Sequence, residues 1–194
     1  MAEQFANLCG AGDLGEVKEL LQGGADLNSF LGNGTKKRTA LMVALNNEKT
    51  EVASFLLRQE GIDVNIGDSN GWSALHCAAR NDENIECLAM ILARPDLDLA
   101  KVYTPNQTDS WTSLHTAASA GAARCLQLLL NDERIGPNKE YFCHDDCRCY
   151  EGVTPIMLAV MYNHAECVEV LLAEPRVDVM TRDWSRKGDK EVAR

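Results

Sequence analysis

Aromatic side chains, basic charge and long apolar runs are all scarce in this sequence. Aromatic residues make up 6% of the 194 residues although 45% are hydrophobic, a balance that suits stacked small helices better than a β-sandwich. Lysine and arginine number 19 against 29 aspartate and glutamate residues, which gives a net charge of −10. Because such a chain repels phosphate groups, we expect no nucleic acid or anionic membrane surface as a partner. A protein or peptide with basic residues fits better.

Signals for membranes, secretion and catalysis are also missing. No stretch approaches about 18 consecutive apolar residues, and the N-terminus lacks the basic start and apolar run of a signal peptide. We therefore expect no membrane insertion and an intracellular protein, in the cytoplasm or alternatively in the nucleus. The sequence contains no serine–histidine–aspartate constellation, phosphate-binding loop or zinc-hydrolase helix motif, so the prediction is that it is not an enzyme.

The chain does contain a repeat. Residues 71–79 read GWSALHCAA, and related segments are RTALMVAL at 38–45, WTSLHTAA at 111–118 and GVTPIMLAV at 152–160. Their hydroxyl residues are 34, 39 and 42 positions apart, close to the period of about 33 that is typical of ankyrin repeats with loop insertions. A second apolar segment follows each copy, at 52–57, 87–92, 125–130 and 167–172. This arrangement predicts two short helices per repeat.

These motifs resemble the ankyrin repeat family. Thr154 and Pro155 match the family's Thr-Pro start, the pairs at 75–76 and 114–115 match its Leu-His, and residues 23–26 resemble its turn after the second helix. The resemblance implies an all-α ankyrin repeat solenoid, a single domain over 1–194, in which His76 and His115 bond between neighbouring units. About five helix-turn-helix units joined by hairpin-like loops are expected at approximately 1–37, 38–66, 67–110, 111–151 and 152–185, before a C-terminal tail.

Most of the eight cysteines have a place in this repeat. Three of them share the helix position that Val17 and Val52 occupy in other copies, and two more lie in or beside the small-residue pairs of first helices. Cysteine at such positions behaves as a small buried hydrophobe. The five predicted core cysteines are Cys9, Cys77, Cys87, Cys125 and Cys167.

The other three cysteines lie in the insertion 131–151, beside a histidine. Cys143, His144, Cys147 and Cys149 fall within seven residues, and thiolate and imidazole are zinc ligands. This cluster is the candidate zinc site; no other cofactor is expected. A metal- or redox-responsive regulatory module is therefore an alternative function. The spacing matches no structural zinc pattern, so an exposed acidic loop with oxidisable thiols is the competing interpretation.

Stacked repeats form an extended concave surface that binds other proteins. Trp72 and Trp111 share one register position before a first helix, and Trp184 falls at a neighbouring position of the last hairpin. Tryptophan is enriched among interface anchors, although each ring has the alternative of packing on the neighbouring hairpin. The other candidate partner-binding residues lie at hairpin tips or first-helix ends: Arg38, Asn46, Asn47, Arg80, Asn81, Asp109, Met161 and Tyr162.

Acidic residues at the hairpin tips complete this hypothesis. Asp68, Asp109, Glu151 and Asp183 would attract a partner segment with lysine or arginine, or alternatively only shape the turns. The sequence thus favours a non-catalytic protein-protein interaction module, with a monomer as the expected state. A regulatory array within a larger protein is the remaining alternative.

Overall fold

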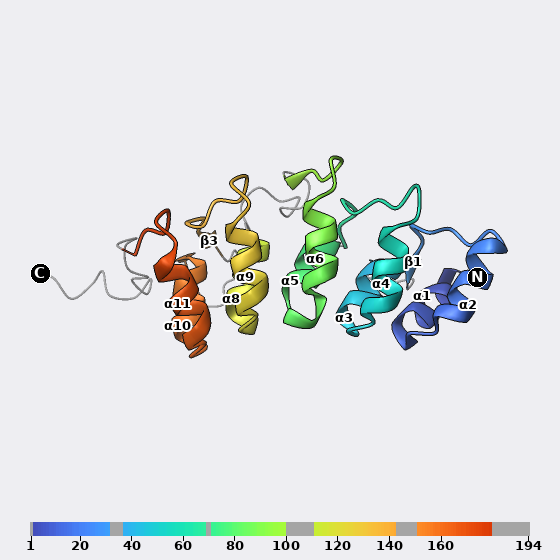
Figure 1. Ribbon diagram of the computed structural model, residues 1–194, viewed down its shortest axis with the longest axis horizontal. Coiled ribbons are helices and arrows are strands. Elements are labelled where there is room, and N and C mark those ends of the chain that lie inside the picture. The colour runs from blue at the N-terminus through green and yellow to red at the C-terminus, as the bar shows by residue number, and fades with distance from the viewer. Residues whose placement is uncertain (1, 32–36, 69–70, 100–110, 143–150, 180–194) are drawn as a thin grey trace, which may run out of the picture.

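The structure is a computed structural model that describes residues 2–31, 37–68, 71–99, 111–142 and 151–179. Within these ranges the chain forms helix pairs that stack side by side along one axis (Figure 1). This confirms the predicted all-α repeat solenoid. The first helices are α1 (Ala2–Ala11), α3 (Ala40–Asn46), α5 (Ala74–Ala79), α8 (Ser113–Ala120) and α10 (Pro155–Met161). The second helices are α2 (Leu14–Gln22), α4 (Thr50–Leu57), α6 (Ile85–Leu92), α9 (Ala123–Leu130) and α11 (Ala165–Ala173).

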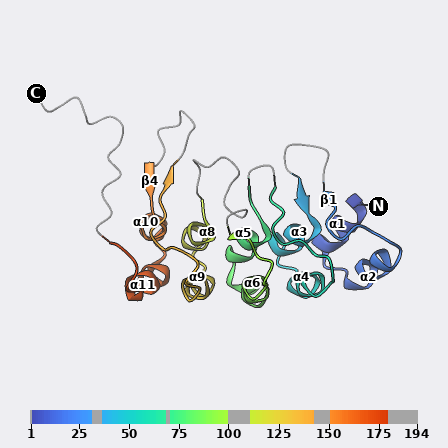
Figure 2. The ribbon, with the colours of Figure 1, turned by 90° about the horizontal axis from the view of Figure 1, so that it is seen from above.

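Three layers are visible when the stack is seen from above (Figure 2): hairpins, first helices and second helices. Two of the hairpins contain short antiparallel strands, β1 (Phe30–Leu31) with β2 (Arg38–Thr39), and β3 (Tyr141–Phe142) with β4 (Glu151–Val153). The first helices lie in the middle layer, and in the third pair the first helix is the more enclosed of the two. All six residues of α5 are buried, whereas α6 buries three of its eight, so the second helices form the outer face.

Hydroxyl side chains explain where the first helices begin. Thr39 Oγ1 accepts a hydrogen bond from Met42 N at 3.3 Å. Thr112 forms a capping box: its side chain accepts from His115 N, and its own backbone N–H donates to the His115 side chain. Such reciprocal caps satisfy backbone donors that the helix itself leaves unpaired. In the fifth pair Met157 takes the histidine position, and Thr154 Oγ1 is buried without a hydrogen-bond partner.

The predicted core cysteines are confirmed: all five are buried and free. Cys87, Cys125 and Cys167 continue a row that Val17 and Val52 begin on the second helices. Burial raises the pKa of Cys125 to about 12, so this thiol stays protonated at neutral pH. These cysteines therefore act as small core residues, not as nucleophiles.

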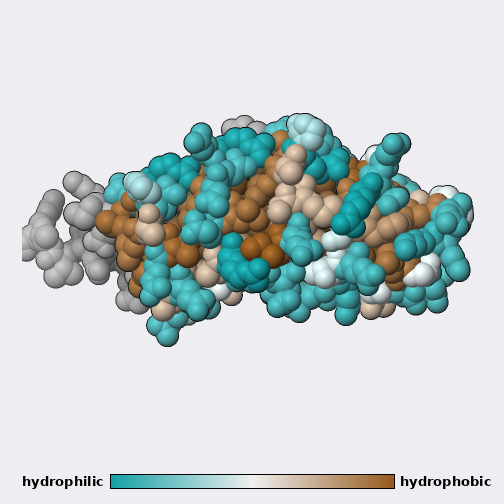
Figure 3. All heavy atoms as spheres, viewed as in Figure 1, coloured by the Kyte–Doolittle hydropathy of each residue, from teal (hydrophilic) through white to brown (hydrophobic). Residues whose placement is uncertain are grey.

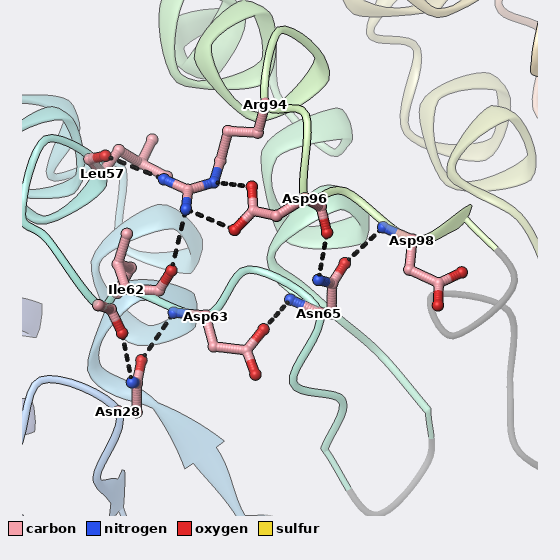
Figure 4. Close-up of polar contacts among 9 residues, drawn as sticks. Asn28, Leu57, Ile62, Asp63, Asn65, Arg94, Asp96 and Asp98 are labelled. Carbon is pink, nitrogen blue, oxygen red and sulfur yellow. Dashed lines mark hydrogen bonds and ion pairs between the residues drawn. The ribbon is translucent and has the colours of Figure 1, made fainter.

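Asparagine side chains join successive pairs at the turns after the second helices (Figure 4). Asn65 Nδ2 donates to the backbone oxygen of Asp96 and its Oδ1 accepts from Asp98 N, both at 2.8 Å. Asn28 makes the equivalent two bonds to Gly61 O and Asp63 N. Because each amide bonds a donor and an acceptor of the next turn, it fixes the spacing between the two turns.

Arginine side chains add a second link at the same turns (Figure 4). Arg94 donates to the carbonyls of Leu57 and Ile62 in the preceding pair. Its Nη2 also forms an ion pair with Asp96 Oδ2 at 2.7 Å. Arg134 and Arg176 reach back in the same way to the carbonyls of Leu92 and Leu130. The C-terminal end of a helix carries partial negative charge, so a guanidinium there is favourable.

Candidate partner-binding surface

Trp72 lies on the hairpin side of the third pair, directly before α5. Its ring centroid is 5.6 Å from that of His76, with the two planes tilted by 42°. The backbone N–H of Trp72 donates to Asp68 Oδ1 at 3.0 Å, which fixes the turn that carries the ring. The tryptophan is half-buried, so part of the indole remains on the surface.

Trp111 occupies the equivalent place before α8 but makes more contacts. Its centroid also lies 5.6 Å from a histidine, His115, and Tyr141 of β3 meets the indole edge-on with centroids 4.9 Å apart. Trp111 Nε1–H donates to Thr116 Oγ1 at 2.9 Å. One polar group and one flank of this ring are thus used inside the protein. Tyr141 did not stand out in the sequence, because its strand register depends on the hairpin fold.

The two histidines beside these tryptophans each bond to the backbone of the next pair. His76 Nδ1 accepts from Ser73 N at 3.3 Å, so the proton of the neutral ring lies on Nε2, which donates to the Trp111 carbonyl at 3.0 Å. His115 repeats the pattern with Thr112 N and the Val153 carbonyl. This confirms the expected bonds between neighbouring units. Burial lowers the pKa of each histidine to about 4, so both are neutral at physiological pH.

The hypothesis that Asp68 faces a partner is wrong. The residue is only 7% exposed, and its carboxylate accepts the Trp72 backbone bond. Arg38, on β2 of the preceding hairpin, has its Nε 4.0 Å from Asp68 Oδ2. Asp68 therefore shapes its turn, the alternative that the sequence had left open.

The candidate residues at the first-helix ends mostly link neighbouring pairs. Asn46 Nδ2 donates to Cys77 Sγ at 3.4 Å, Asn47 Nδ2 to the Gly10 carbonyl at 3.0 Å, and Asn81 Nδ2 to Glu48 Oε1 at 2.7 Å. These amides join neighbouring pairs on the side of the stack away from the turns that follow the second helices. Arg80, next to them, is exposed to solvent.

Met161 and Tyr162 lie at the end of α10 in the fifth pair. Tyr162 is 52% exposed and its ring stacks near His164, while Met161 is half-buried. Met161 also lines a shallow apolar hollow at this end of the described stack, together with Ile156, Met157, Val160 and Val179.

Several predicted site residues lie outside the described residues. They are Trp184, Asp109, Asp183, Cys143, His144, Cys147 and Cys149. Among the residues that the structure describes, no group of three or more histidine, cysteine, aspartate or glutamate side chains is arranged to hold a metal ion. In the same part of the chain, every helix is too short or too polar to cross a membrane.

Comparison with known proteins gives matches that cover most of the chain. A family model described as ankyrin repeats (3 copies) matches residues 6–102 and 96–183. The human SMC5-SMC6 complex localization factor protein 1 is 39% identical over 103 residues, which are 53% of this chain and 9% of that protein.

Two further relatives match more of the chain at lower identity. The rice probable E3 ubiquitin-protein ligase XBOS32 is 26% identical over 88% of this chain and 37% of its own length. The human transient receptor potential cation channel subfamily A member 1 is 28% identical over 80% of this chain and 13% of its own length. The chain thus spans well under half of each of these proteins.

Proposed function

We propose that this chain, which belongs to the ankyrin repeat family, is a non-catalytic module that binds a partner protein through its hairpins and first helices. The observation that carries the proposal is the pair Trp72 and Trp111. Each indole lies at the same register position, directly before a first helix, and at the same 5.6 Å from a buried histidine.

Rigidity makes these two rings suitable anchors. His76 bonds the backbone of Trp111, and His115 bonds the backbone of Val153, so both rings sit on a framework that spans three helix pairs. A fixed aromatic surface loses little conformational entropy when a partner covers it. Interfaces commonly concentrate their binding energy in a few such tryptophan anchors.

The charge of the chain supports a partner segment with lysine or arginine. The net charge is −10, and opposite charge on a partner accelerates association and favours the correct orientation. The relatives are named as a localization factor, a probable ubiquitin ligase and a cation channel, so similar repeats accompany different activities. This variety supports an interaction module over a shared chemistry. The five buried free thiols support an intracellular location.

The test is a capture experiment from cell extract, read by mass spectrometry. The parent chain is compared with the Trp72→Ala, Trp111→Ala double variant, and with Glu60→Ala, at the exposed turn after α4, as a control away from both surfaces. We expect the parent and the control to capture a protein that the double variant loses while its far-UV circular dichroism is unchanged. Capture of the same set by all three chains would overturn the proposed surface.

A further inference from the structure

A row of apolar side chains crosses the outer face of the stack, opposite the hairpins. Each of the helices α2, α4, α6, α9 and α11 carries one apolar residue at the same register position. Each of these residues is half-buried and packs with one flank against the core. Figure 3 shows apolar surface extending across these helices between polar margins. The members of this outer row are Leu20, Phe55, Met90, Leu128 and Val170.

A second row of charged residues runs beside the outer row. It lies four positions earlier on each helix, and side chains four positions apart lie on the same helix face. All its members are exposed, and four of the five are acidic. The members of this charged row are Glu16, Glu51, Glu86, Arg124 and Glu166.

The two rows meet in a groove across α6, α9 and α11. Its volume is about 510 Å³, and its apolar lining is Ile85, Ala123, Leu128 and Val170. Polar side chains surround this lining, with Glu166 and Glu169 on the α11 side. A shallow apolar floor with a charged margin has the composition of a site that takes the apolar face of a helix.

We propose that this outer groove is a second docking surface, and that its occupant is an amphipathic helix with basic residues beside its apolar stripe. The proposal goes beyond the hairpin-side function. Packed helices lie about 10 Å apart, and seven residues of a helix rise about 10 Å. A helix that crosses the outer face therefore presents one apolar residue to each outer-row position if its apolar residues recur every seven positions.

Charge complementarity determines that the partner helix should be positively charged beside its apolar stripe. Lysine or arginine four positions from each apolar residue would meet Glu166 in the groove and Glu86 of the charged row on α6. Glu169 adds negative charge at the α11 end. Arg124 is the one basic member of the charged row. It therefore opposes a basic partner at the centre of the groove, which provides a test in which binding should improve.

The probe is a designed, fluorescein-labelled helical peptide of about 20 residues, with leucine at every seventh position and lysine four positions before each leucine. Fluorescence anisotropy is measured against the full chain. We expect saturable binding that weakens with added salt. Each of the exposed-site variants Glu86→Lys and Glu166→Lys should weaken binding about threefold, whereas Arg124→Glu should strengthen it about threefold.

Two controls distinguish this surface from the hairpin side. A peptide of the same composition without the seven-residue spacing should bind at least tenfold more weakly. The Trp72→Ala variant, which removes the hairpin-side ring with fewer internal contacts, should bind the probe as the parent does. Failure of the probe to saturate, equal binding of both peptides, or indifference to the three charge variants would overturn the inference. Loss of binding in the tryptophan variant would also overturn it and would place the peptide on the hairpin side.

Discussion

The carboxylate of Asp82 accepts a hydrogen bond of 2.8 Å from the backbone N–H of Cys125, and a second of 3.2 Å from Arg124. Asp82 belongs to the third pair, whereas these two N–H groups begin α9 in the fourth pair. The residue at the N-cap of α9, Ala122, provides no side-chain cap. One pair therefore caps the second helix of the next, which couples helix formation to stacking as expected in a repeat array.

Replacement of Asp82 should measure this coupling. We expect Asp82→Ala to lower the free energy of unfolding by about 1–2 kcal/mol, because two N–H groups lose their acceptor. Asp82→Asn should lose less than half as much, because its amide oxygen still accepts one bond. Urea unfolding followed by far-UV circular dichroism gives both values. Parent-like stability of Asp82→Ala would show that solvent caps α9 equally well.

The sequence predicted the features that recur at a fixed position from one repeat to the next. The register of hydroxyl and leucine residues located the first helices and the core cysteines, because each recurs at a fixed offset. The His76 and His115 bonds were expected from the resemblance to ankyrin repeats. The Asp82 cap did not follow from the register, because its partner lies 43 residues away and no other pair supplied a matching pattern.

The candidate surface was only partly predictable for a related reason. Register placed Trp72 and Trp111 at one position, yet it could not reveal that Tyr141 packs on only one of the two rings. The orientation of Asp68 was also undetermined, since an aspartate at a hairpin tip serves equally well as a turn residue or as a surface charge. Contacts made across the hairpins decide both cases.

The stability of the protein should fall as the pH drops from 6.5 towards 4. His76 and His115 have pKa values near 4 in the folded chain, against 6.5 when unfolded, so in this window only the unfolded state binds their protons. Each histidine contributes up to about 1.4 kcal/mol per pH unit. We expect a combined slope that approaches about 2.7 kcal/mol per pH unit near about pH 5.

Urea unfolding across this pH range, repeated with glutamine variants, assigns the slope. Glutamine does not titrate, and at this helix position it can still bond the cap backbone. His76→Gln should therefore reduce the slope by about half, and the His76→Gln, His115→Gln double variant should remove most of it. A slope that persists in the double variant would assign the acid sensitivity to other groups.

The two tryptophans should differ in their effect on stability. Trp111→Ala removes the Tyr141 contact and the bond to Thr116, so we expect a loss of about 3 kcal/mol. Trp72→Ala should cost about 1 kcal/mol. Thermal and urea unfolding of the single variants measure the difference, and Trp111→Phe separates ring packing from the lost N–H donor. Equal losses would contradict the distinct packing of the two rings.

Two glycines with similar backbone angles should respond differently to alanine. Gly61 has φ of 82° and Gly121 has φ of 75°, a region that side chains disfavour by about 1–2 kcal/mol. An added Cβ at Gly61 meets nothing within 4 Å, but at Gly121 it would lie 2.6 Å from His164 Nδ1. The His164 ring would have to move and would lose its 3.1 Å bond to the Ser119 carbonyl, which joins the fourth and fifth pairs.

We therefore expect Gly61→Ala to cost about 1 kcal/mol and Gly121→Ala about 3 kcal/mol, since the second adds overpacking and a lost hydrogen bond. Urea unfolding of the two variants provides the comparison at nearly constant backbone strain. Adding His164→Ala to Gly121→Ala should recover part of the loss, because the clash is removed while the strained φ remains. If that addition only increased the damage, the cost at Gly121 would come from the backbone alone.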